Sequence, residues 1–243
     1  PDLSNGVQIG GVAVTSTAAE LNILDGVTST AAELNILDGV TSTAAELNIL
    51  DGVTSTAAEL NKLDGVGTLK QAGKESIWVP ATAMYPSTTN PCSDLTQVET
   101  TALRPDLKVL DFATGADDFA QFTVAFPKSW NEGTVTFQPF WTVTGTNTGT
   151  VAWQLGGIAV SNDDSINTAF GTLVATTALA HSGTSNDLMV SVESGAVTIA
   201  GSPAANDMCF FQINRDVSAD NQSGDARLLG IKLFFTTDAA NDA

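Results

Sequence analysis

The chain has few basic residues, and this scarcity excludes several classes of partner. Its 243 residues include 9 Lys plus Arg against 27 Asp plus Glu, which gives a formal net charge of -18. Nucleic acids and anionic membrane surfaces both require basic protein surface, so we expect neither as a partner. No stretch approaches the ~20 consecutive apolar residues of a membrane-spanning helix, so we expect no membrane insertion.

Residues that build disulfide frameworks and metal centres are also scarce. Cys92 and Cys209 are the only cysteines, and their spacing fits neither a disulfide framework nor a metal-ligand pair. Cys209 lies in the apolar stretch "MCFFQI", which predicts a buried free thiol. His181 is the only histidine, and no G-x-S-x-G motif accompanies it. We therefore predict no catalytic residue and no required cofactor.

What the sequence does have is a tandem repeat. "VTSTAAELNILDG" begins at Val14, Val27 and Val40, and returns at Val53 with one change, Lys62 in place of Ile. Globular cores seldom keep exact copies, because each core position has different neighbours. Exact copies therefore indicate units with identical surroundings, as in a fibre.

Each repeat predicts a short helix between turns. Thr17 and Glu20 have the spacing of a capping box, and the residues "AAEL" are good helix formers. Asp25-Gly26 ends the helix, since Gly adopts the left-handed conformation of a C-terminal cap. The next residues, "VTS", favour extended structure.

So short a helix cannot bury its apolar residues alone, because isolated helices below ~12–15 residues are marginal in water. We therefore predict that several identical chains pack side by side around a shared axis. The acidic residues of the repeats should then face water. The predicted packing positions are Val14, Leu21, Leu24, Val27, Leu34, Leu37, Val40, Leu47, Leu50, Val53, Leu60 and Leu63. A flexible low-complexity linker is the alternative, but it fits poorly with so many Leu, Ile and Val residues.

The tandem "TSTAAELNILDGV" resembles the repeats of phage tail fibres and related virion fibres, and the match covers about residues 14–66. The resemblance implies a homotrimeric fibre of the virion with a C-terminal tip that contacts the host cell. It also implies that the N-terminal side binds other virion proteins. Whether the fibre belongs to a tail or a head does not follow from it.

A second region begins after residue 72. Here alternating apolar residues dominate, as in "FTVAF" (Phe122, Val124, Phe126) and "TVTFQPFWTVT", and polar turn segments separate them. We predict eight to ten strands in an antiparallel, jelly-roll-like β-sandwich. The predicted organisation is a lead-in at 1–13, a repeat shaft of short helices and extended links at 14–72, and a β-sandwich tip domain at 73–243. Phe140 and Phe234 break the alternation, which fits packing between subunits.

Candidate ligand-binding residues lie in the loop "SNDDSIN". Asn162, Asp163 and Asp164 offer oxygen ligands that could hold Ca²⁺ or a polar glycan, although their spacing is not that of an EF-hand. The acid pairs Asp117–Asp118 and Asp163–Asp164 could serve glycoside hydrolysis only if their side chains converged across a cleft. Adjacent loop residues seldom do so, which favours solvated turn acids.

The sequence favours a structural, receptor-binding fibre whose tip attaches to a host-surface glycan or protein. Two alternatives stay open: a connector or decoration fibre without receptor binding, and a polysaccharide-degrading tailspike.

Overall fold

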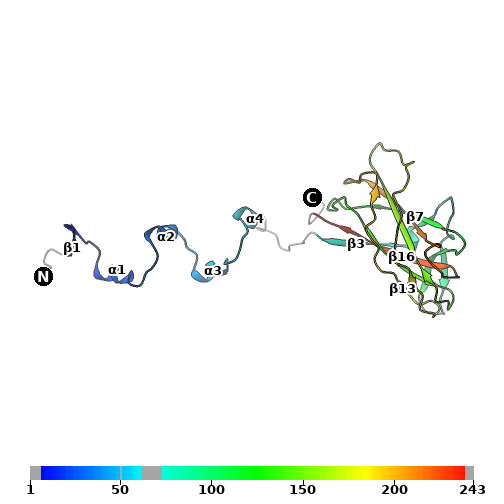
Figure 1. The fold of residues 1–243 in the computed structure, drawn as a ribbon, viewed down its shortest axis with the longest axis horizontal. Coiled ribbons are helices and arrows are strands. Elements are labelled where there is room, and N and C mark those ends of the chain that lie inside the picture. Colours follow the sequence, from blue (N-terminus) through cyan, green and yellow to red (C-terminus); the bar gives the residue numbers. More distant parts are fainter. Residues whose placement is uncertain (1–6, 50, 62–72, 239–243) are drawn as a thin grey trace. The chain divides into compact units, whose positions relative to one another are not determined.

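The structure is a computed structural model that describes residues 7–49, 51–61 and 73–238. The chain divides into two compact units, residues 1–65 and 66–243, which we call the repeat unit and the β-sandwich (Figure 1). Each is described by itself. Among the described residues, no helix is long and apolar enough to cross a membrane.

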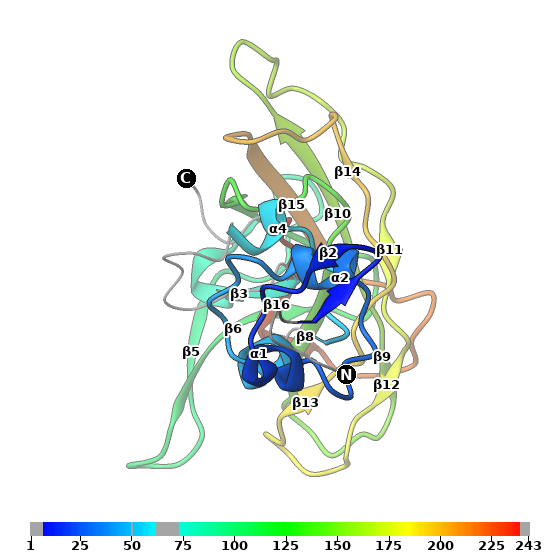
Figure 2. The same ribbon diagram turned by 90° about the vertical axis from the view of Figure 1, so that its left-hand side faces the viewer.

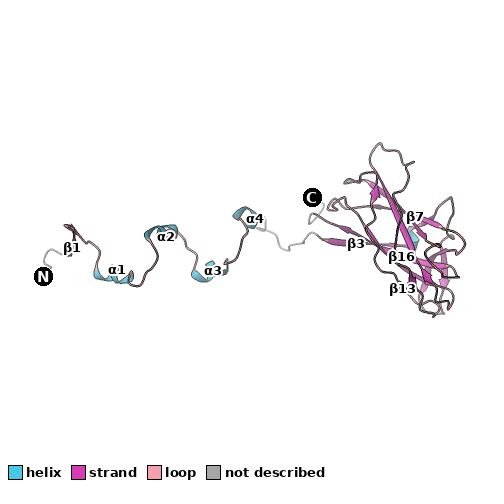
Figure 3. Cartoon of the chain, in the orientation of Figure 1, coloured by secondary structure: helices cyan, strands magenta, loops and turns pink. Residues whose placement is uncertain are grey.

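The repeat unit opens with a small hairpin and continues as one short helix per repeat. Strands β1 (Gln8–Ile9) and β2 (Val12–Ala13) pair antiparallel. They are followed by α1 (Ala18–Ile23), α2 (Ala31–Ile36), α3 (Ala44–Ile49) and α4 (Ala57–Asn61). Figure 3 shows these helices separated by extended segments, as the sequence predicts.

The predicted capping box is confirmed in the helices. In α1 the Glu20 backbone N–H donates to Thr17 Oγ1 over 3.2 Å, and the Thr17 N–H donates to Glu20 Oε2 over 2.7 Å. The same bonds join Thr to Glu in the other three helices. Gly26, one residue before the next repeat, has φ +82°, so the chain leaves each helix through the left-handed turn that glycine permits.

No described residue of these helices is buried within the chain. In the second repeat Leu34 is 42% exposed, Leu37 54% and Ile36 77%. The equivalent residues of the other repeats have similar values. Leu50, Lys62 and Leu63 lie outside the described residues. A single chain thus leaves all the described leucines of the repeats uncovered.

The second unit is an antiparallel β-sandwich, as predicted, built from two main sheets (Figure 2). The first sheet runs in the order β11 (Val174–Ala175), β10 (Trp153–Val160), β15 (Met208–Arg215), β7 (Phe119–Ala125) and β4 (Tyr85–Pro86), with β14 (Ile199–Ala200) parallel to β10. The second runs β13 (Met189–Val190), β8 (Thr136–Val143), β16 (Ala226–Thr236), β6 (Asp106–Phe112) and β5 (Thr96–Glu99), with β3 (Lys74–Pro80) also on β16.

Smaller elements complete the sandwich. Strands β9 (Thr150–Val151) and β12 (Leu179–Ala180) form a separate pair, and a 3-10 helix, η1, spans Ala81–Ala83. The long strands β6, β7, β8 and β10, with only the short β9 between the last two, alternate between the two main sheets. Crossovers of this kind are used by jelly-roll sandwiches.

The core lies between the two sheets and contains the predicted inward-facing residues. Phe122, Val124 and Phe126 of one stretch are all buried, and so are Trp141 and Trp153. The Trp153 ring packs edge-on against Phe112 at 5.0 Å between centroids. The two tryptophans therefore fill the core, as the alternation of their strands indicates.

Two apolar stretches form less strand than their composition indicates. Residues 188–192 form only the two-residue strand β13, and residues 196–200 form only β14. Strands β3, β5 and β6 were not predicted individually. Within the described residues the sandwich has eight strands of four residues or more and six of two residues.

Candidate functional site

A polar pocket lies on the outer face of the first sheet. We call it the tyrosine pocket; its volume is about 300 Å³, and it is lined by Tyr85, Pro86, Ser87, Thr88, Thr89, Gln121 and Gln212. Tyr85 is the only tyrosine of the chain and is 47% exposed. No lining residue carries a charged group.

Strand register brings the three main side chains of this pocket together. Tyr85 of β4 lies opposite Gln121 of β7, and Gln121 lies opposite Gln212 of β15. Side chains directly opposite on an antiparallel pair share one face, with Cβ atoms about 4.5–5.5 Å apart. A phenol ring and two amides therefore stand in a row across three strands.

The rim of the tyrosine pocket is tied to the sheet by backbone bonds. Ser87 N–H donates to the Phe119 carbonyl over 3.0 Å, and Phe119 N–H donates to the Asn90 carbonyl over 2.8 Å. The Ser87 hydroxyl also donates to the Thr89 carbonyl. The segment that carries the Ser and Thr lining residues is thus held in one conformation.

A row of amides extends beyond the pocket on the same face. Asn214, two residues after Gln212, donates to Gln154 Oε1 over 3.2 Å, and Gln154 Nε2 donates to Asp216 Oδ2 over 2.7 Å. Asn214 is fully buried, and its Oδ1 has no hydrogen-bond partner in the described structure. The sequence alone does not distinguish these glutamines, because single polar residues on a strand are typical of ordinary sheet surface.

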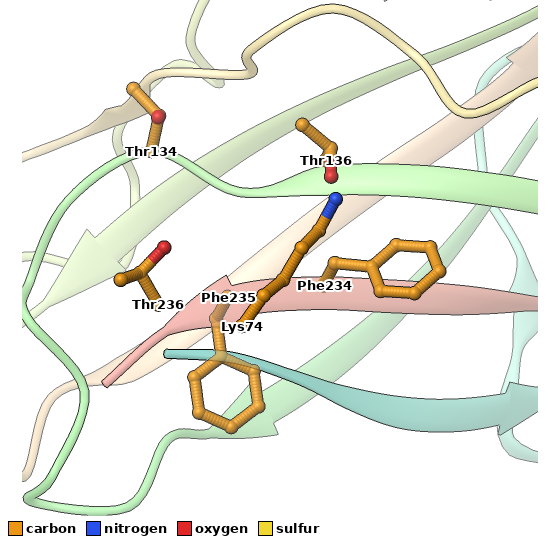
Figure 4. A pocket seen from close by; sticks show the side chains of 6 residues that line it. All are labelled: Lys74, Thr134, Thr136, Phe234, Phe235 and Thr236. Atoms are coloured by element: carbon orange, nitrogen blue, oxygen red, sulfur yellow. The ribbon is translucent and has the colours of Figure 1, made fainter. Parts of the chain in front are cut away.

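A second pocket, of about 190 Å³, lies on the other sheet and is shown in Figure 4. We call it the lysine pocket; its lining is Lys74, Thr134, Thr136, Phe234, Phe235 and Thr236. Glu193 forms an ion pair with Lys74 and accepts a hydrogen bond from Thr136 Oγ1. These bonds lower the pKa of Glu193, the Lys74 bond most. Lys74 and Thr136 are thus already paired within the chain.

Aromatic side chains accompany this second pocket. Lys74 Nζ lies 4.6 Å from the Phe234 ring centroid, and Trp78 packs edge-on against Phe140 at 5.1 Å. Trp78 is about half exposed, and Phe140 and Phe234 are partly exposed. We call Trp78, Phe140 and Phe234 the aromatic face.

The loop predicted to touch a ligand is exposed. Asn162, Asp163 and Asp164 follow β10, and Asp163 has φ +70°. Asp164 Oδ2 accepts from the Ser161 N–H over 3.2 Å. Across the described residues, no three His, Cys, Asp or Glu side chains gather as a metal site would require. The loop stays a sequence-based prediction.

The other ionisable candidates have structural contacts. Asp117 Oδ1 accepts from the Val217 N–H over 3.1 Å, and Asp118 Oδ2 accepts from the Ala113 N–H over 3.0 Å. These two partly exposed carboxylates accept hydrogen bonds from separate backbone groups. His181, the only histidine, is buried with its Nδ1 3.2 Å from the Asn147 carbonyl.

Both cysteines are buried and free. Burial raises the pKa of each thiol to about 12, with smaller contributions from nearby aspartates. The prediction of a buried free thiol at Cys209 is confirmed.

No protein-family model matches this chain, and no curated protein matches it. Among solved structures, the CBM36-1 domain of a multidomain xylanase from the hindgut metagenome of Trinervitermes trinervoides has a TM-score of 0.37 and 11% identity, covering 65% of this chain and 96% of that one. The Caldicellulosiruptor saccharolyticus CBM27-1 in complex with mannohexaose has a TM-score of 0.39 and 10% identity, covering 70% and 99%. The family 11 carbohydrate-binding module from Clostridium thermocellum has a TM-score of 0.37 and 9% identity, covering 68% and 96%. At these TM-scores the likeness does not extend beyond the general architecture of a β-sandwich.

Proposed function

We propose that this chain is a structural and receptor-binding fibre of a phage virion. In this proposal three copies assemble through the 13-residue repeats into a shaft. The C-terminal β-sandwich of each copy attaches to a host-cell surface glycan or protein, and the N-terminal side joins other virion proteins. The observation that carries the proposal is the exposure of the repeat leucines.

The argument for self-assembly comes from the regularity of that exposure. Leu34 and Leu37 are about half exposed in the single chain, and their counterparts recur every 13 residues in the same environment. Apolar side chains repeated at fixed spacing need a covering surface with the same period. Another copy of this chain supplies that period, since repeat structures bury their apolar faces against equivalent neighbours.

The β-sandwich offers a second surface for contact between copies. The aromatic face lies on the outer side of β3, β8 and β16, where a solvated sheet would carry only polar residues. Lys74, beside it, is the first residue of β3, and the repeats precede it in the chain. This supports the interpretation of Phe140 and Phe234 as packing residues between subunits.

A binding role fits the observed polar groups better than a catalytic one. The carboxylates considered for glycoside hydrolysis, Asp117 and Asp118, bind backbone amides of different segments. The tyrosine pocket presents neutral hydrogen-bonding groups and no carboxylate. The acidity of the chain, with net charge -18, disfavours an anionic receptor.

Light scattering and adsorption assays with the full chain test the two halves of this proposal. The expected molar mass in solution is three times 25.0 kDa. A monomer at high concentration would refute assembly through the repeats. A stable trimer that adsorbs to no host cell would instead favour the connector fibre. Shortening of host polysaccharide by the protein would favour the tailspike.

A further inference from the structure

We propose that the tyrosine pocket is the glycan-binding site of the β-sandwich and that it takes one unit of an uncharged sugar chain. This inference rests on the proposed function, because it assumes that the sandwich binds a surface glycan. It adds the place of the site, the residues that bind, and the class of sugar.

Unsatisfied hydrogen-bonding capacity is the first argument. A glutamine amide has two N–H donors and one carbonyl acceptor. Gln121 and Gln212 are half-buried in the pocket, and neither side chain has a hydrogen-bond partner within the described structure. Polar groups in such a position need water or a ligand as partner. Two adjacent amides can bind neighbouring hydroxyl groups of one sugar ring, each group both donating and accepting.

Tyr85 supplies the complementary apolar contact. Its half-exposed ring lies next to Gln121 across the β4–β7 pair. A sugar ring has an apolar face of C–H groups and a rim of hydroxyls. The tyrosine side chain has an apolar ring that can contact the C–H face of the sugar and a polar hydroxyl that can bind its rim. The ring face of the sugar would contact Tyr85 while its hydroxyls reach the two glutamines.

The lack of charge in the lining selects for an uncharged ligand. An anionic sugar would be recognised through Arg or Lys, and a cation would require carboxylate ligands. Neither kind of side chain lines this pocket. The lysine pocket is lined by the charged Lys74, which already forms an ion pair with Glu193. A neutral glycan therefore fits the tyrosine pocket better than the lysine pocket.

Size and rigidity complete the argument. The volume of about 300 Å³ is at the lower end of small-molecule sites, which suits one sugar unit of a longer chain. Beneath the two glutamines, Phe122 and Phe211 stack with their ring centroids 5.2 Å apart. Phe122 follows Gln121 along β7, and Phe211 precedes Gln212 along β15. Both rings are buried and anchor their strands in the core. A site held in this way loses little freedom on binding.

The test is titration of the full chain with soluble oligosaccharides chosen from an array of neutral and uronate-bearing glycans. We expect wild-type protein to bind a neutral glycan. Tyr85→Ala and the double variant Gln121→Ala/Gln212→Ala should each weaken this binding at least about tenfold. Thr123→Ala, an exposed position on the same face of β7 outside the pocket lining, is the matched control and should bind normally. Unchanged molar mass and unfolding temperature show that each variant is folded.

Several results would overturn the inference. Unchanged neutral-glycan binding by both folded variants would place the site elsewhere and leave the proposed function intact. Binding of uronate-bearing glycans alone would contradict the uncharged class. Adsorption to host cells without binding to any glycan would point to a protein receptor. If wild-type trimers neither adsorb nor bind any glycan, the proposed receptor function itself fails.

Discussion

Replacing two leucines of one repeat should dissociate the proposed trimer. In the single chain Leu34 is 42% exposed and Leu37 is 54% exposed. Full burial of a leucine is worth ~1.5–3 kcal/mol, so covering the remaining half is worth about 1 kcal/mol. Two leucines in three chains contribute roughly 6 kcal/mol per trimer. Loss of that amount raises the dissociation constant by roughly four powers of ten.

The variant Leu34→Ala/Leu37→Ala isolates packing from helix formation, since Ala is the better helix former. Ile36→Ala is the matched control: Ile36 is 77% exposed and is outside the predicted packing set. Molar mass should be measured by light scattering over a dilution series. The double variant should dissociate at concentrations where wild type and Ile36→Ala remain trimers. Equal dissociation of the two variants, or none in either, would contradict shared burial of the leucines.

Three further predictions concern the pH response, the sandwich core and the last repeat. Hydrogen bonds from the capping threonine lower the pKa of Glu33 and its equivalents below 4.5. A carboxyl group whose pKa is lower in the folded chain stabilises its helix at any pH above the unfolded pKa, and this stabilisation is lost as the pH falls through the folded pKa. Far-UV circular dichroism should therefore lose helical signal below about pH 4.5. In the core, Arg215 is fully buried, and its Nε lies 2.6 Å from Asp220 Oδ2. The variant Asp220→Asn should lower the free energy of unfolding of the sandwich by about 3–5 kcal/mol, as measured with urea. A near-zero change would mean that the charge of Asp220 is not needed. The variant Lys62→Ile restores the residue of the other repeats, whose isoleucines are about three-quarters exposed. The unfolding temperature of this variant should match that of wild type, and a large decrease would show that the position is covered.

The repeat helices could be predicted because their determinants are local. Thr17 and Glu20 are three residues apart, and the same short contact recurs in each copy. The long strands were predictable for a similar reason, since alternation along β7 and β8 is set by one buried face. The two-residue strands were not predictable. Strand β13, for example, forms only where residues 189–190 meet β8, and that meeting depends on the whole sandwich.

The tyrosine pocket could not be predicted from the sequence. Tyr85, Gln121 and Gln212 come from three distant segments, and only the register of β4, β7 and β15 makes them neighbours. Each looks ordinary on its own strand. The acidic loop at Asn162–Asp164 was easier to notice, because its polar residues are consecutive, although adjacency along a loop says little about convergence in space.

The proposed shaft and the proposed sugar site depend on each other energetically. A few neutral hydrogen bonds at about 1 kcal/mol each, with one partly exposed tyrosine, give a single pocket an affinity in the roughly millimolar range. One copy would therefore leave a cell surface quickly. Three pockets held on one assembly can gain roughly 10²–10⁴ in avidity where the surface repeats its sugar units. It follows that Leu34→Ala/Leu37→Ala, which leaves every pocket residue unchanged, should abolish adsorption to cells at dissociating concentrations. The same variant should bind a monovalent oligosaccharide as wild type does. Loss of both would mean that the repeats act on the pocket itself, and loss of neither would mean that a single sandwich suffices for attachment.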